Sequence, residues 1–335
     1  MKKPLSQLSW LALSLFLIAL SAYALNPIQP ELKVEEFYSS EKKCKGTQVT
    51  GQTPDTTIPA LVTSNHRLYS QECFESILSE ILKKSSKPFV LFISGRGTHP
   101  SKEIEKENLL LLNIEKQYDV TAVMFTWPSW CGLRCFPHAK AYESGAALLK
   151  LLRTIKYLKE KDIQNRTYTL LSHSMGSLVL QGLADLNIDD LSKNLFDKII
   201  ISAAASSQND HRIWLNKLTF GTQLFITTNK NDNVLKCLES DVGGFGPVKI
   251  FCDEFQLTSR LGRWGTAKAT IHNTSENTFY IDFTKGLQGT HRYYINQMNK
   301  SSEIFRFYSQ VFQGNPVQLI NYDEIISGRV YKLRK

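Results

Sequence analysis

The fold of this chain is decided by the stretch Tyr168-Thr169-Leu170-Leu171-Ser172-His173-Ser174-Met175-Gly176, in which an apolar run passes into a polar turn. The apolar run predicts a buried strand, and the pattern of Leu178–Leu186 predicts a helix directly after the turn. A sharp turn between a strand and a helix projects one side chain above the sheet, here that of Ser174. Ser172 and Gly176, two residues before and after it, are small enough for a crowded turn. We therefore interpret Ser174 as a reactive serine rather than as a helix N-cap.

Strands and helices alternate on both sides of this turn. Short apolar runs predict further strands at Phe89–Ile93, Val120–Phe125, Ile199–Ser202, Leu224–Thr227 and Phe279–Phe283. Helical spacing follows Ser101 and recurs in Ala141–Lys159 and Tyr293–Phe312, whereas residues 238–270 are a Gly-rich insertion with little periodicity. This alternation predicts an α/β fold with a mostly parallel central sheet flanked by helices. Such a sheet places its reactive loops at the C-terminal ends of its strands.

Residues 1–24 have the features of a secretory signal peptide. Lys2 and Lys3 precede the apolar stretch Leu11–Leu20, and Ala22-Tyr23-Ala24 provides a small-x-small cleavage site. The alternative, an uncleaved membrane anchor, is disfavoured because the stretch is short for a span of ~20 residues. We therefore expect export to the periplasm or out of the cell, with cleavage near Ala24.

The rest of the chain divides into an arm and one large domain. Residues 25–64 are polar and contain four prolines, which predicts an extended arm with little regular structure, and residues 65–335 are predicted to form the α/β domain. The full chain has 335 residues, 42% of them hydrophobic, and a net charge of +9. This composition excludes a disordered chain, a collagen-like fibre and a polytopic membrane protein. The basic surplus predicts a solvated face, with a membrane-binding patch as the alternative, and export makes nucleic acid a poor partner.

All six cysteines follow the predicted cleavage site, at Cys44, Cys73, Cys131, Cys135, Cys237 and Cys252. An even number in an exported chain favours disulfides, although sequence alone does not choose among the pairings. The most local scheme joins Cys44 to Cys73, Cys131 to Cys135, and Cys237 to Cys252. A structural zinc site is the alternative, but no Cys-x-x-Cys pair or matching histidine spacing supports it.

A serine hydroxyl is a weak nucleophile at neutral pH and needs a general base that a carboxylate orients. In this type of sheet the acid and then the histidine follow the serine along the chain. Asp232 lies in a polar turn after the strand at Leu224–Thr227 and is the candidate acid, with Asp210 as the alternative. His291 lies in the loop after the last predicted strand and is the candidate base. His272 is the alternative base, but it precedes that strand.

Charge that develops on a carbonyl oxygen during acyl transfer is stabilised by preorganised N–H donors, an oxyanion hole. The Met175 N–H, directly after the candidate nucleophile, is the first predicted donor. The second comes from the loop Ser94-Gly95-Arg96-Gly97, where the Arg96 N–H is favoured and the Gly97 N–H is the next choice. A plain turn without this role is the alternative for the loop.

Trp127 and Trp130 begin an aromatic and apolar loop after the second predicted strand. Beside a reactive serine, such a loop predicts an acyl or aromatic substrate pocket. A hydrophobic cap closed by a Cys131–Cys135 disulfide explains the same residues equally well. If the loop lines a pocket, we expect the substrate to be an uncharged ester with an apolar part.

The order of strand, glycine turn, serine elbow, aspartate and histidine resembles the α/β-hydrolase superfamily. Within it, the chain resembles the bacterial family known as domain of unknown function 900 over roughly residues 88–300. The matching segments are Phe125-Thr126-Trp127-Pro128-Ser129, Tyr142-Glu143-Ser144, His173-Ser174-Met175-Gly176, Asn231-Asp232-Asn233-Val234-Leu235 and His291-Arg292-Tyr293. The resemblance implies a Ser-Asp-His hydrolase. Two positions depart from the family pattern. The family has His-Gly after the first strand, where this chain has Ser94-Gly95, and it has Gly-His where this chain has Thr290-His291.

We therefore expect an exported serine hydrolase of carboxylic esters, in which Ser174, His291 and Asp232 form a triad and the reaction passes through an acyl-enzyme. The expected substrate is a small-molecule ester or a lipid, and this chemistry needs no metal or organic cofactor. An amidase or peptidase is one alternative, because the triad does not distinguish the bond. A non-catalytic binding protein on a hydrolase scaffold is the other.

Overall fold

The computed structural model describes residues 47–48, 59–64, 67–97, 100–129, 136–191, 193–209, 211–239, 259–267, 271, 274–296, 302–326 and 328–334. The chain separates into two units, Met1–Lys43 and Cys44–Lys335, and every described residue lies in the second. The predicted signal peptide, most of the predicted arm and residues 240–258 of the Gly-rich insertion lie outside the described residues.

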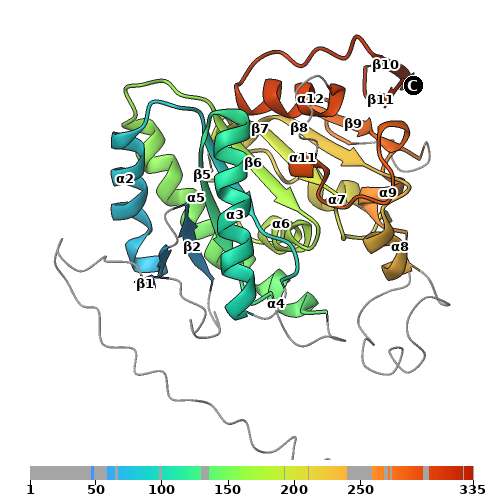
Figure 1. Ribbon diagram of the computed structural model, residues 1–335. Helices are drawn as coiled ribbons and strands as arrows, with labels where there is room; N and C mark the ends of the chain where they lie inside the picture. Colours follow the sequence, from blue (N-terminus) through green and yellow to red (C-terminus); the bar gives the residue numbers. More distant parts are fainter. Residues whose placement is uncertain are drawn as a thin grey trace, which may run out of the picture. The chain divides into compact units, whose positions relative to one another are not determined.

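The eleven described strands form one sheet, in the order β1-β3-β2-β5-β4-β6-β7-β8-β9-β11-β10 (Figure 1). They are β1 (Thr47–Gln48), β2 (Ala60–Thr63), β3 (Arg67–Tyr69), β4 (Phe89–Ile93), β5 (Thr121–Thr126), β6 (Tyr168–His173), β7 (Phe196–Ser202), β8 (Gly221–Thr228), β9 (Thr278–Asp282), β10 (Tyr322–Ile326) and β11 (Val330–Leu333). Neighbours from β5 to β11 are parallel, whereas β1, β3 and β2 at one edge and β10 at the other are antiparallel. The predicted α/β fold with a mostly parallel sheet is confirmed.

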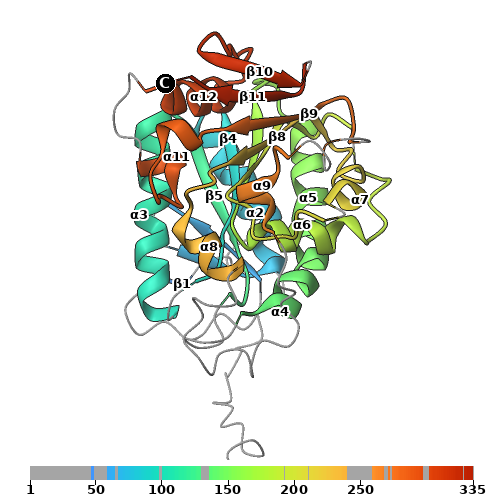
Figure 2. The ribbon, with the colours of Figure 1, turned by 90° about the vertical axis from the view of Figure 1, so that its right-hand side faces the viewer.

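Helices cover both faces of this sheet, with α2, α4, α5, α6 and α7 on one face and α3, α11 and α12 on the other (Figure 2). The described helices are α2 (Phe74–Lys84), α3 (Pro100–Tyr118), α4 (His138–Glu143), α5 (Gly145–Glu160), α6 (Gly176–Ala184), α7 (His211–Leu215), α8 (Asn233–Glu239), α9 (Leu261–Trp264), α11 (Tyr293–Asn296) and α12 (Glu303–Phe312). None of them is both long and apolar enough to cross a membrane. Cover on both faces explains why the central strands are continuous apolar runs.

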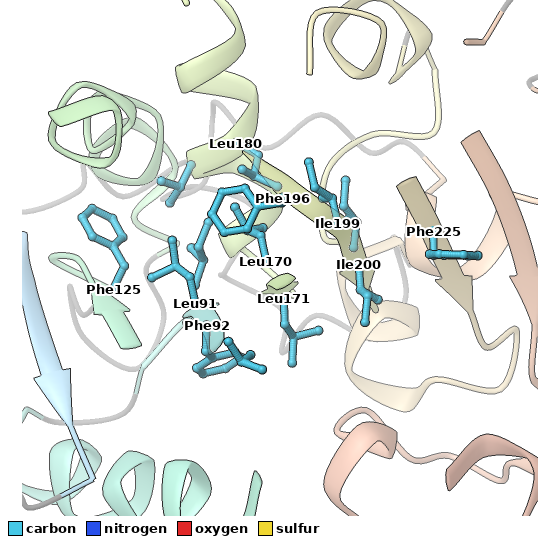
Figure 3. Close-up of a cluster of buried hydrophobic side chains, with 14 of the residues drawn as sticks. Leu91, Phe92, Phe125, Leu170, Leu171, Leu180, Phe196, Ile199, Ile200 and Phe225 are labelled. Carbon is cyan, nitrogen blue, oxygen red and sulfur yellow. The ribbon is translucent and has the colours of Figure 1, made fainter. Parts of the chain in front are cut away.

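The core has one apolar layer on each face of the sheet (Figure 3). The strand register aligns Leu91, Leu170 and Ile199 on one face and Phe92, Leu171 and Ile200 on the other. All of these side chains are buried, and each contributes about 1.5–3 kcal/mol relative to an exposed position. A slip of one residue would turn every one of them to the opposite face. The core therefore fixes which residues stand at the strand ends.

The helix predicted over Ala141–Lys159 is two helices, α4 and α5, which meet at Ser144. The Ser144 hydroxyl donates to the carbonyl four residues earlier at 2.6 Å, a bond that bends helices. Beside the break, the backbone of this helix pair touches that of α6. A Cβ atom at Gly182 would overlap the Tyr142 carbonyl, and one at Gly145 would overlap the α6 backbone. The break therefore accompanies an unusually close packing of three helices.

Three other elements differ from the prediction. The helix predicted over Tyr293–Phe312 divides into α11 and α12, and Ser302 caps α12 by accepting from the Phe305 N–H at 3.1 Å. At the N-terminal side, β2 is fully buried and pairs with β5, so the predicted lack of regular structure is wrong at Ala60–Thr63. The hairpin of β10 and β11 near the C-terminus was not predicted.

The structure describes two of the six cysteines. Cys237, on α8, has a free thiol, so the predicted Cys237–Cys252 disulfide is wrong. Cys73 is disulfide-bonded, and its partner lies outside the described residues. The predicted pairings of Cys44 with Cys73 and of Cys131 with Cys135 both involve residues outside the described ranges, so they stay predictions.

Candidate active site

Ser174 lies in the turn between β6 and α6, as predicted. Its φ angle is 52°, a left-handed conformation that costs a non-glycine residue about 1–3 kcal/mol and persists only where the surroundings enforce it. The end of β7 and the loop after it do so: the Ser174 N–H donates to the Ser202 carbonyl at 3.0 Å, and the Ala205 N–H donates to the Ser174 carbonyl at 3.1 Å. A strained turn of this kind presents a nucleophile above a parallel sheet.

The turn is crowded on the side of β4. A Cβ atom at Gly176 would lie 2.9 Å from the Ile93 carbonyl oxygen and 3.0 Å from Ser172 Oγ, so small residues are required at both predicted flanks. A Cβ atom at Gly95 would lie 2.9 Å from that of Ser174. Gly95 therefore lets the loop after β4 approach the turn. The Ser172 hydroxyl is buried and has no hydrogen-bond partner among the described residues.

Asp232, the predicted acid, follows β8 and caps the N-terminus of α8. Its Oδ1 accepts from the Val234 and Leu235 N–H groups, both at 3.0 Å. Its Oδ2 lies 2.7 Å from His291 Nδ1. The carboxylate is fully buried, so these donors replace the water that a charged group would otherwise need. The helix cap thus holds one oxygen in place and aims the other at the imidazole.

His291, the predicted base, is held in its loop by asparagines that the sequence reasoning did not single out. The Asn229 side chain donates to the Gln288 carbonyl at 3.0 Å and to the Thr290 carbonyl at 2.9 Å. The Asn231 side chain donates to a third carbonyl of the same loop at 3.2 Å. The loop after β8 therefore carries the acid and also fixes the loop that carries the histidine. The polar composition of the turn around Asp232 was the available signal.

His173 connects the acid–imidazole pair to the serine turn. Its ring centroid lies 4.6 Å from that of His291, and its backbone directly precedes Ser174. Burial, followed by the neighbouring His291 and Arg292, holds the pKa of His173 well below its ordinary value. Its buried imidazole therefore favours the neutral form. The three predicted residues thus follow β6, β8 and β9, at the C-terminal ends of the parallel strands.

The predicted oxyanion donors belong to the serine turn and to the turn after β4. Met175 is the N-cap residue of α6 and is buried. Arg96 lies in the turn after β4, with its guanidinium carbon 5.0 Å from the Phe136 ring centroid. The Gly97 N–H, the second choice from this loop, donates to the Ser129 carbonyl at 3.3 Å. This bond makes Gly97 a poorer candidate donor, and the choice of the Arg96 N–H stays a prediction.

Trp127 does not line a pocket, contrary to one of the two interpretations of its loop. Its side chain is fully buried, and its indole N–H donates to the Ser94 carbonyl at 2.9 Å. Trp127 therefore supports the loop that carries Arg96 and offers no surface to a substrate. Trp130 lies outside the described residues, as do the alternative acid Asp210 and the alternative base His272.

A cleft of about 460 Å³ opens where β5 ends and β2 begins. It is lined by Pro59, Gln71, Pro128, Lys140, Glu143, Ser144, Ala146 and Ala147. This mixture suits a ligand with both apolar and polar parts. Among the residues that the structure describes, no group of three His, Cys, Asp or Glu side chains converges to hold a metal ion.

Comparison with known proteins relates the chain to one family. The family model described as "Alpha/beta hydrolase of unknown function (DUF900)" matches residues 70–244, just over half of the chain. The matched segment includes Ser174 and Asp232 and ends before His291. No curated protein matches the chain.

Proposed function

Because this chain belongs to the family of alpha/beta hydrolases of unknown function (DUF900), we propose that it is a serine hydrolase in which Ser174, His291 and Asp232 act as the triad. The observation that carries the proposal is the 2.7 Å contact of His291 Nδ1 with a fully buried carboxylate, beside a serine held at a φ of 52°. A carboxylate on one imidazole nitrogen favours the tautomer in which the other nitrogen accepts a proton. Activation of a serine hydroxyl requires that tautomer.

In the proposed reaction, Ser174 Oγ attacks the carbonyl carbon of the substrate while His291 Nε2 takes its proton. Asp232 accepts the Nδ1–H of His291 and stabilises the imidazolium that forms. The Met175 and Arg96 N–H groups stabilise the developing oxyanion. His291 then returns the proton to the leaving group. Water, activated by the same histidine, releases the acyl group and regenerates Ser174.

We further propose that the scissile bond is a carboxylic ester of a small molecule or lipid, and that the protein is exported. The mixed lining of the cleft near β5 supports an ester with an apolar part. The signal-peptide features of residues 1–24 support export. An amidase or peptidase would use the same machinery, so the substrate panel below includes amides.

The test is turnover of p-nitrophenyl esters and matched anilides by the purified mature chain, with fluorophosphonate labelling of the active serine. Ser174→Ala is expected to abolish turnover and labelling, because it removes the nucleophile. Ser76→Ala, at an exposed position on α2, is the control and should leave both unchanged. Wild-type activity in Ser174→Ala would refute the proposal. Faster turnover of anilides than of esters would identify an amidase instead.

A further inference from the structure

A short helix, α9, joins the loop that supports Ser174 to the loop that carries Asp232. The Gly262 N–H donates to the Ala204 carbonyl at 2.9 Å, in the loop after β7. The Asn229 N–H donates to the Gly262 carbonyl, also at 2.9 Å, in the loop after β8. Figure 2 shows α9 close to α8, against which it packs. One helical turn therefore bonds to both loops on which the proposed triad depends.

Arg263 reaches from α9 to both ends of the segment that contains Asp232. Its Nε and Nη2 donate to the Lys230 carbonyl oxygen at 3.0 and 2.8 Å, two residues before the acid. Its Nη1 donates to the carboxylate of Glu239, the last residue of α8. The side chain is only 11% exposed, so these bonds are shielded from water. Arg263 therefore fixes the position of segment 230–239 at its start and at its end.

Glu239 anchors Arg263 in this arrangement. One of its oxygens accepts from the Arg260 N–H at 2.6 Å, and the other accepts from the Trp264 Nε1–H at 3.1 Å. The carboxylate is 14% exposed and thus largely removed from solvent. Charge-assisted bonds between a guanidinium and a carboxylate are directional as well as strong. The pair therefore holds α8 and α9 in one relative position.

We propose that Arg263 is a positioning residue for the hydrolase reaction, which sets the distance and direction of Asp232 toward His291 by holding the Lys230 carbonyl against α9. The inference rests on the proposed function of the triad. Arg263 touches neither the reacting atoms nor the carboxylate of Asp232, and it acts through the backbone between them. A misplacement of ~1 Å in a catalytic group costs on the order of 100-fold in rate. Loss of this clamp is therefore a catalytic defect as well as a structural one.

The first experiment compares two arginine-to-methionine variants, which lose every donor but keep an apolar side chain. Arg263→Met removes the clamp. Arg153→Met is the matched control, because Arg153 also pairs with a carboxylate, that of Asp190 at 2.8 and 3.0 Å, but does so on the exposed surface of α5. With an ester substrate, kcat per fluorophosphonate-titrated site should fall on the order of 10–100-fold in Arg263→Met, with KM little changed. Arg153→Met should match the wild type.

A spectroscopic readout separates positioning from mere stabilisation. The proton between His291 Nδ1 and Asp232 is expected to give an isolated low-field resonance in one-dimensional proton NMR, which Arg263→Met should shift or remove. Arg263→Lys, which keeps one cationic donor, should restore part of kcat and of the resonance. A lower Tm combined with wild-type kcat per titrated site and an unchanged resonance would overturn the inference.

Two further variants keep the test decisive. Should Arg263→Met not fold, Arg263→Lys and Glu239→Gln replace it, because both retain the packing and weaken the clamp. Wild-type kcat in both would overturn the inference. Failure of the proposed function is distinguishable, since in that case Ser174→Ala would remain active. Failure of the positioning role alone leaves Ser174→Ala inactive and the Arg263 variants fully active.

Discussion

Replacement of Asp232 by asparagine is a sharp test of the triad, because the structure leaves the new side chain one favourable orientation. The Val234 and Leu235 N–H groups, each 3.0 Å from Oδ1, need an acceptor, so the amide oxygen must face them. The amide nitrogen then occupies the place of Oδ2, 2.7 Å from His291 Nδ1. Two N–H donors cannot face each other there, so Nδ1 must give up its proton and become the acceptor.

The magnitude follows from that change of tautomer. The proton moves to Nε2 of His291, the nitrogen that has to take the proton of Ser174, and the base is lost. A tautomer change of this kind costs about 10⁴-fold in kcat in a Ser-His-Asp protease, which is about 5.4 kcal/mol of transition-state stabilisation. Asparagine caps helices as well as aspartate does, so we expect the thermal midpoint to stay close to that of the wild type.

The assay is kcat for a p-nitrophenyl ester at neutral pH, together with the thermal midpoint and the rate of fluorophosphonate labelling. Asp190→Asn, an exposed partner of Arg153, is the matched control and should retain wild-type values. A folded Asp232→Asn protein whose kcat is within a factor of about ten of wild type would refute the reasoning, because the barrier would then have risen by only about 1.4 kcal/mol.

Three further predictions concern residues around the serine turn. Gly95→Ala places a Cβ atom 2.9 Å from that of Ser174, so we expect kcat to fall on the order of 10–100-fold. Wild-type kcat would contradict the close approach of the loop after β4 to Ser174. Ser172→Ala removes a buried hydroxyl without a described partner, so the free energy of unfolding in urea should rise by about 1 kcal/mol, and a decrease would show that the hydroxyl is bonded. Burial lowers the pKa of His173 in the folded state. Its contribution to the free energy of unfolding is therefore fully present above its unfolded pKa of about 6.5. Below that pH the contribution is lost by about 1.4 kcal/mol per pH unit. His173→Phe should remove that part of the acid slope in urea unfolding at about pH 5, 6 and 7, and an unchanged slope would argue against a neutral buried imidazole.

The parts of the fold that were predictable are those in which local pattern and tertiary packing agree. Phe89–Ile93 was predicted to the residue because a strand covered on both faces is apolar throughout. Ser174, Asp232 and His291 were singled out because parallel strands bring their C-terminal ends together, and the structure places all three after such strands. The break at Ser144 was not predicted, because the apolar positions that indicated this helix, from Leu148 to Leu158, all follow it.

The features that escaped prediction depend on contacts between distant segments. Trp127 follows a strand as a pocket residue would, and only its bond to the Ser94 carbonyl shows that it belongs to the core. Arg263 lies in the Gly-rich insertion, where its sequence context is that of a surface arginine. Its near-complete burial and its bonds to Lys230 arise only when α9 packs beside α8. No local pattern of residues encodes such a contact.

The contact between α6 and the α4–α5 pair has a consequence for engineering. In a saturation library read out by activity or expression, positions 145 and 182 should accept glycine and almost nothing else, although both are helical and neither takes part in the chemistry. The position of α6, the helix that begins two residues after Ser174, is thus fixed by its packing against α4 and α5. Attempts to change substrate preference should keep Gly145 and Gly182 and vary the loops at the C-terminal ends of the strands.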